Sequence, residues 1–191
     1  MDEQELQRAM ESFIASLAQP SIPHWDALPD LDLYMDQVIA FMEKYLSLFG
    51  DSRDKLITPS MINNYVKLGV LPPPVKKKYN REYLARLTTI CMLKQVLPIP
   101  VLAHLNDRIA AHSSLSTVFD QFVDEQCAAL QSVSQTAQTD VAALAGEHMS
   151  EGLAQLALKL AAQANACRVL AEKTALLLLE QQQGEKPHKK S

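Results

Sequence analysis

Glycine and cysteine are both scarce in this chain. Only 5 of its 191 residues are glycine, whereas 48% are hydrophobic. This composition is typical of a globular, helix-rich protein with a substantial core, and it excludes a disordered one. The three cysteines are widely separated, odd in number and never spaced C-x-x-C. Such a pattern argues against a disulfide framework and fits a reducing cytoplasm.

Long apolar runs are also missing. No run approaches the roughly 18 residues that a membrane span needs. The first residues, M-D-E-Q-E-L-Q, are acidic and polar, unlike a secretory signal. We therefore expect a cytoplasmic protein that has no membrane partner.

The sequence offers no pattern that supports catalysis. Its five histidines are scattered, without His-Glu-x-x-His spacing, and no glycine-rich phosphate loop occurs. Cys91, Cys127 and Cys167 lie on or beside apolar helix faces, where we expect each to act as a small buried hydrophobe. We predict no enzyme activity, no cofactor and no metal site.

Positive charge is concentrated in one segment of an acidic chain. Residues 51–95 hold nine Lys and Arg against three Asp and Glu, a net charge of +6, and since the whole chain carries −4 the rest carries −10. A basic module inside an acidic chain is what binding to nucleic-acid phosphates requires. The alternative is a solvated charged surface with no partner.

The basic segment contains a distinctive helix–stop–loop–helix pattern from Ile57 to Arg86. Thr58 is placed to cap a helix over 58–68, with a proline at its first position. Gly69 supplies a left-handed stop, and three prolines then forbid helix. Lysines 76–78 follow, and Asn80 can cap the next helix, 81–96. The core faces of the two helices are Met61, Ile62, Tyr65, Val66 and Leu68 in the first, and Leu84, Leu87, Ile90 and Cys91 or Leu93 in the second.

This stretch resembles the DNA-binding core of MerR-type regulators, whose recognition helix reads roughly S-V-R-T-L-R-Y-Y-D-R-I-G-L-L-P and precedes a basic wing. The resemblance covers 58–72 and then 79–90, with Asn63-Asn64 in place of the family's Arg-Tyr. The matching positions are Tyr65, Gly69, Leu71, Pro72, Tyr79, Leu84, Arg86, Leu87 and Ile90. Residues 20–110 also resemble an uncharacterised bacterial family with a MerR-like domain.

The resemblance implies a transcriptional regulator that binds double-stranded DNA. Helix 58–68 would enter the major groove, where Asn suits adenine and Ser or Thr suits base edges or phosphate. The wing, residues 72–79, would hold phosphates through its lysines. The expected DNA-binding residues are Thr58, Ser60, Asn63, Asn64, Lys67, Lys76, Lys77, Lys78, Tyr79 and Arg81. The alternative is a non-enzymatic protein-interaction module that docks an acidic partner on the same scaffold.

The flanking segments read as further helices. Apolar spacing predicts helices over 3–17, from Asp30 or Asp32 to Phe49, and over 101–111. Trp25 lies in a proline-rich linker, where we expect it to plug the edge of the core. Another helix, capped by Ser116, is expected to break near 134–140, before a final helix that ends near Gln183.

The final helix carries an apolar seam that needs a partner. The seam comprises Leu153, Leu156, Leu160, Cys167, Leu170 and Leu177. Either the first helix covers it or a second chain does, and a homodimer is favoured over a closed pocket for a small-molecule effector. The fold class is therefore mainly α: a winged helix-turn-helix domain plus a C-terminal helical hairpin or bundle. The expected divisions are 1–112, 113–183 and a disordered tail, 184–191.

Overall fold

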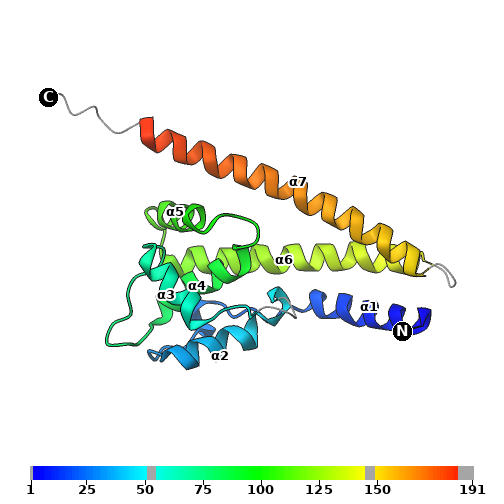
Figure 1. The fold of residues 1–191 in the computed structure, drawn as a ribbon, viewed down its shortest axis with the longest axis horizontal. Coiled ribbons are helices and arrows are strands. Elements are labelled where there is room, and N and C mark those ends of the chain that lie inside the picture. The colour runs from blue at the N-terminus through cyan, green and yellow to red at the C-terminus, as the bar shows by residue number, and fades with distance from the viewer. Residues whose placement is uncertain (1, 51–54, 145–148, 185–191) are drawn as a thin grey trace.

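A computed structural model describes residues 2–50, 55–144 and 149–184, and within them the chain is mainly helical, as predicted. The expected tail lies outside these residues, apart from Gly184. Figure 1 shows the elements arranged around the long helix α6. The helices are α1 (Glu3–Ala18), η1 (Trp25–Ala27), α2 (Met35–Tyr45), η2 (Ser47–Phe49), α3 (Pro59–Lys67), α4 (Arg81–Leu93), α5 (Ile99–Ala110), α6 (Leu115–Ala142) and α7 (Met149–Gly184).

Helix α4 lies at the centre of the larger hydrophobic cluster. Its predicted core residues Leu84, Leu87, Ile90 and Cys91 are all buried, whereas Leu93 is only partly so. The helix also buries residues on its other faces, because α2, α3 and the first half of α6 supply side chains to the same cluster. This central position holds α3 and the loop that follows it against a packed support.

A smaller cluster joins the two ends of the chain. Ile14 of α1, Ala137 and Val141 of α6 and Leu156 of α7 are buried together. Figure 1 shows α1 lying along the second half of α6, and α7 begins beside the end of α6. Because α6 contributes to both clusters, it connects the basic segment to the terminal helices.

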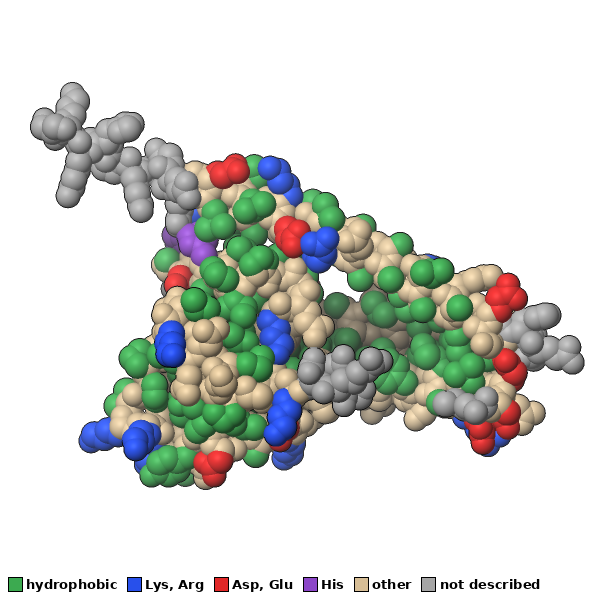
Figure 2. All heavy atoms as spheres, viewed as in Figure 1, with side chains coloured by type: hydrophobic (Ala, Val, Ile, Leu, Met, Phe, Trp, Pro, Cys, Tyr) green, Lys and Arg blue, Asp and Glu red, His purple; other side chains and the backbone are tan. Residues whose placement is uncertain are grey.

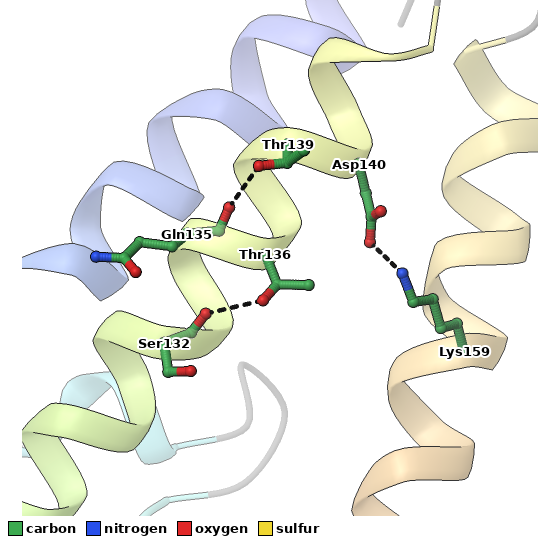
Figure 3. Close-up of polar contacts among 6 residues, drawn as sticks. All are labelled: Ser132, Gln135, Thr136, Thr139, Asp140 and Lys159. Carbon is green, nitrogen blue, oxygen red and sulfur yellow. Dashed lines mark hydrogen bonds and ion pairs between the residues drawn. The ribbon is translucent and has the colours of Figure 1, made fainter.

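The expected helix break at 134–140 is wrong, since α6 runs without interruption from Leu115 to Ala142. The polar residues of this stretch find partners within the helical arrangement. In Figure 3 the hydroxyls of Thr136 and Thr139 donate to the carbonyls of Ser132 and Gln135, each at 3.1 Å, and Asp140 pairs with a lysine of α7 at 2.6 Å. Packing against α1 therefore overrides the weak helix propensity of the stretch.

Ser134 makes the contact that we expect to matter most for this junction. It is 3% exposed, and its hydroxyl donates to the carbonyl of Ile14 over 2.9 Å. Ser134→Ala should lower the free energy of unfolding by about 1 kcal/mol, measured by urea denaturation followed by circular dichroism. Ser132→Ala, at an exposed position of the same helix, should change it by less than about 0.5 kcal/mol. Equal losses in the two variants would contradict this role.

Several helix starts and ends differ from expectation. Helix α4 ends at Leu93, before the expected 96, and α5 begins at Ile99, before the expected 101. Helix α2 begins at Met35, not after Asp30 or Asp32, because Leu33 is held extended by paired backbone hydrogen bonds to Tyr79, both 2.9 Å. It ends at Tyr45, and the short helix η2 continues to Phe49. Ser114, not Ser116, caps α6 by accepting from the Thr117 N–H at 3.2 Å.

Trp25 plugs the edge of the larger cluster, as predicted. Its ring meets that of Phe119 edge-on, with centroids 6.5 Å apart. Its backbone N–H donates to the Asp120 carboxylate at 2.7 Å. Both partners lie on α6, so these contacts fix the linker against that helix.

Candidate nucleic-acid interface

The helix α3 is bounded by the signals that the sequence carries. The Thr58 hydroxyl accepts from the Met61 N–H at 3.2 Å, and Pro59 occupies the first position. At the other end Gly69 adopts φ +70°, while the N–H groups of Gly69 and Val70 donate to the carbonyls of Val66 and Tyr65. These two bonds form a Schellman motif, which fixes the direction in which the chain leaves the helix.

The two faces of α3 differ sharply. Ile62 and Tyr65 are buried in the larger cluster, and this burial raises the pKa of the Tyr65 hydroxyl. Leu68 was expected on the same face but is 57% exposed, because it lies where the helix already turns into its glycine stop. The opposite face presents the exposed side chains of Ser60, Asn63, Asn64 and Lys67. They line an open hollow of about 730 Å³, together with Met61, Tyr65 and Ile99.

The wing ends in a tight two-residue hairpin. Val75 and Lys78 exchange backbone hydrogen bonds of 3.1 and 2.9 Å. Between them Lys76 and Lys77 adopt φ values of 51° and 63°. This is the geometry of a type I′ turn, in which Asn-Gly is usual and lysine is strained. Both lysines are exposed, and Figure 2 shows basic side chains standing out at the tip of this loop.

The remaining predicted contact residues are held by the protein itself. The Lys78 ammonium lies 5.3 Å from the centre of the Tyr34 ring. Tyr79 is only 4% exposed, packs against Tyr83 at 4.6 Å, and has its pKa raised by burial. Arg81 donates from Nε to the carbonyl of Pro29 at 3.4 Å and lies over the Trp25 ring. These contacts therefore fix the end of the wing and the start of α4 to the segment that precedes α2. The exposed face consists of Ser60, Asn63, Asn64, Lys67, Lys76 and Lys77.

A separate apolar cavity of about 480 Å³ lies between α4, α5 and α6. Leucines, valine, isoleucine and the rings of Phe119 and Phe122 form most of its wall. Polar groups at the wall include Arg86, whose guanidinium pairs with Asp107 at 3.1 Å, and Thr89, whose hydroxyl donates to a backbone carbonyl. The sequence did not identify this cavity, because its wall is assembled from three helices.

Reactive groups are sparse in the described part of the chain. No cluster of three His, Cys, Asp or Glu side chains able to hold a metal occurs there, and none of its helices has the length and apolar character to cross a bilayer. Burial raises the pKa of the Cys91 thiol to about 12, so the thiolate does not form near neutral pH. Cys167 was expected to be buried but is exposed.

The predicted seam of α7 is divided by the structure. Leu153, Leu156 and Leu160 pack in the smaller cluster of their own chain, with α1 and α6. Leu170 and Leu177 are 69% and 52% exposed, like the neighbouring Cys167. The first part of the seam is thus covered by the first helix, which was the alternative to a second chain, and the second part is left uncovered.

Comparison with known proteins gives one match. A family model described as a domain of unknown function (DUF1836) matches residues 23–125. No curated protein and no solved structure matches the chain. The matched region begins beside Trp25 and ends within the first half of α6, so it contains the whole exposed face and every residue that lines the apolar cavity.

Proposed function

The chain belongs to the family described as a domain of unknown function (DUF1836), and we propose that it is a DNA-binding transcriptional regulator that acts as a homodimer. In this proposal residues 58–90 form a MerR-like winged helix-turn-helix. Helix α3 enters the major groove, and the wing lies along the phosphates. The observation that carries the proposal is the pair of exposed lysines held in a strained turn beside the exposed polar face of α3.

The strain in the turn supports a functional role. The left-handed backbone conformation costs about 1–2 kcal/mol for a residue that has a Cβ, and here two successive lysines adopt it. Such strain persists where the surroundings impose it, and it is concentrated at functional sites. Exposed lysines contribute little to folding, so binding to phosphate is the role that best accounts for them.

Each exposed residue receives a role from its chemistry. Asn63 and Asn64 would pair with adenine edges, for which the amide has a matching donor and acceptor. Ser60 would bond to a base edge or a phosphate. Lys67, Lys76 and Lys77 would neutralise phosphates and set the position of α3, without reading sequence.

A protein-interaction module is the second candidate. It is favoured by the apolar side chains near the wing, since Leu31 and Val75 are 75% and 72% exposed. An acidic partner with an apolar contact would suit this combination. The two candidates differ in how strongly salt weakens their binding.

The test is a salt titration of the full-length protein on a random-sequence duplex, followed by fluorescence anisotropy. Three exposed lysines per subunit should give a slope of log affinity against log salt of about −2.7 for each bound subunit. Affinity should be restored when the salt is diluted. Absence of binding at low salt would reject DNA as the partner and leave the protein-interaction module.

Asn63 provides the test of sequence reading. Asn63→Ala should weaken binding to the preferred site by about 1–3 kcal/mol and change binding to random DNA much less, because only a base contact distinguishes the two. The preferred site is first obtained by selection from a random duplex library. Lys67→Ala is the matched control, and it should weaken binding to the two duplexes about equally. Equal losses for Asn63→Ala would make Asn63 a positioning residue.

We also propose that the protein is cytoplasmic and that a small-molecule effector binds in the apolar cavity. A volume of about 480 Å³ lies in the range of small-ligand sites. The cavity borders α4, which supports α3 from behind. A bound molecule there would act on the position of α3.

A further inference from the structure

The middle of α7 stands uncovered on all sides. All of residues 161–170 are exposed except Arg168, although they include four alanines, a valine and a leucine. Figure 1 shows the beginning of α7 beside the end of α6, after which the two helices diverge, and Figure 2 shows an opening between them. Helices in proteins gain most of their stability by packing an apolar face, and this stretch has no such contact within the described chain.

Both ends of this stretch are nevertheless fixed to the rest of the chain. At the beginning, Leu156 is buried in the smaller cluster. Towards the end, Ala175 is 2% exposed, and Arg108 of α5 donates to the Gln181 side chain at 3.0 Å. The fold therefore holds the helix out from the body at a defined position, as an interaction surface requires.

One face of the uncovered stretch is continuous and apolar. The face runs from residue 159 to residue 180, which is about 32 Å along the helix axis. At 100° per residue, the side chains that form it fall within a sector about 120° wide. Along the helix axis, Lys159 stands at one end of this face, where its ammonium also pairs with the Asp140 carboxylate of α6 at 2.6 Å, and Glu180 stands at the other end. Both side chains remain exposed. Between them lie Ala162, Ala166, Val169, Leu170, Lys173, Leu176 and Leu177, all exposed as well.

We propose that this face, hereafter the α7 face, binds the same face of a second copy of the chain in an antiparallel pair, with the two-fold axis between Val169 and Leu170. In this register Ala162 lies opposite Leu177, and each small residue receives a large one. Lys159 lies opposite Glu180, so the ends of the face carry complementary charges. An interface of this kind is isologous, and its symmetry closes the assembly at two copies.

Other registers of the same face are less favourable. If the second helix slips by seven residues in one direction, Lys173 lies opposite Lys159 of the second copy. If it slips by seven residues in the other direction, Lys173 lies opposite Lys173 of the second copy. A parallel, in-register pair places every lysine of the face opposite itself. Like charges brought together in a partly buried contact oppose association, whereas the proposed register pairs Lys173 with the small Ala166 and avoids them.

The pair deepens the proposed function and rests on it for its purpose, since a two-fold dimer presents two α3 helices to a palindromic duplex. Its existence can be tested without DNA. Light scattering of the full-length protein alone should give the mass of two chains, and a monomer at all accessible concentrations would overturn the proposal. Such a dimer in a protein that fails to bind DNA would leave this interface standing and reject only the regulator.

Leu170→Glu is the variant aimed at the centre of the interface. Because Leu170 is 69% exposed in the single chain, the change should leave the circular dichroism spectrum intact. It should weaken dimerisation by about a hundredfold or more, since both copies place the charge beside the axis. Ala161→Glu is the control, exposed on α7 but outside the face, and it should stay dimeric. A folded, dimeric Leu170→Glu variant would overturn the proposal.

The register is tested at Ala166, which faces Lys173 of the second copy in the antiparallel pair. Ala166→Glu should strengthen dimerisation by about fivefold, because it creates two new ion pairs, and Ala166→Lys should weaken it. In a parallel pair residue 166 faces itself, so both changes would weaken dimerisation. That result would overturn the antiparallel arrangement.

Discussion

Replacing Lys76 and Lys77 together with alanine is expected to weaken DNA binding about 60-fold for each bound subunit at 0.1 M salt. Two phosphate contacts would be lost, and each contributes about 0.9 to the slope of log affinity against log salt. The slope should therefore fall from about −2.7 to about −0.9 per subunit. Random and preferred duplexes should lose affinity about equally, because phosphate contacts carry no sequence information. The fold should be unaffected, since alanine in the turn is strained much as lysine is.

A charge-matched control separates this local effect from the effect of net charge. Arg8→Glu also lowers the net charge by two units, but at an exposed position on α1, which lies far from the wing in Figure 1. It should leave the salt slope unchanged. A slope that falls equally in both variants would mean that the whole chain's charge, and not the wing, sets the dependence on salt.

The local signals of the basic segment could be read correctly from the sequence. A hydroxyl before a proline, a glycine before three prolines and an asparagine before an apolar run each act within a few residues. Thr58, Gly69 and Asn80 accordingly have the roles that were predicted, with the Asn80 side chain accepting from the Tyr83 N–H at 3.0 Å. The core face of α4 followed from periodicity in the same way.

The features that were missed depend on partners distant in the chain. The pairing of Leu33 with Tyr79 delays the start of α2, and the contact of Ser134 with Ile14 keeps α6 continuous. Periodicity could show that α7 has an apolar seam but could not show where its neighbours end. A charge at Leu160 would therefore disturb the chain's own smaller cluster, whereas Leu170 lies on the uncovered part.

The conformation of the lysine turn was also beyond the sequence. Lysine occurs in loops of every kind, and a run of three predicts only a charged surface. The left-handed backbone arises because Val75 and Lys78 bond to each other while Tyr79 is anchored to Leu33. With both ends of the turn fixed, a type I′ turn closes the two residues between them.

This conformation leads to the second of the large effects, in which stability and binding move in opposite directions. Lys76→Asn with Lys77→Gly installs the pair that a type I′ turn prefers. Asparagine tolerates the left-handed region and glycine enters it without steric cost, so the strain at φ 51° and 63° is relieved. Glycine also gains freedom in the unfolded chain, which offsets part of this relief. The net expectation is a free energy of unfolding higher by about 1 kcal/mol.

The same double variant should lose the two phosphate contacts and bind DNA about 60-fold more weakly at 0.1 M salt. Thermal unfolding measures the first effect, as a rise of about 2–4 °C in the midpoint, and anisotropy on a random duplex measures the second. Lys76→Ala with Lys77→Ala supplies the comparison, because it removes the same charges without relieving the strain. If the lysines serve phosphate binding, the alanine and Asn-Gly variants bind equally weakly, and only the Asn-Gly variant is more stable. An Asn-Gly variant that binds DNA like the original chain would show that the strained turn serves another partner.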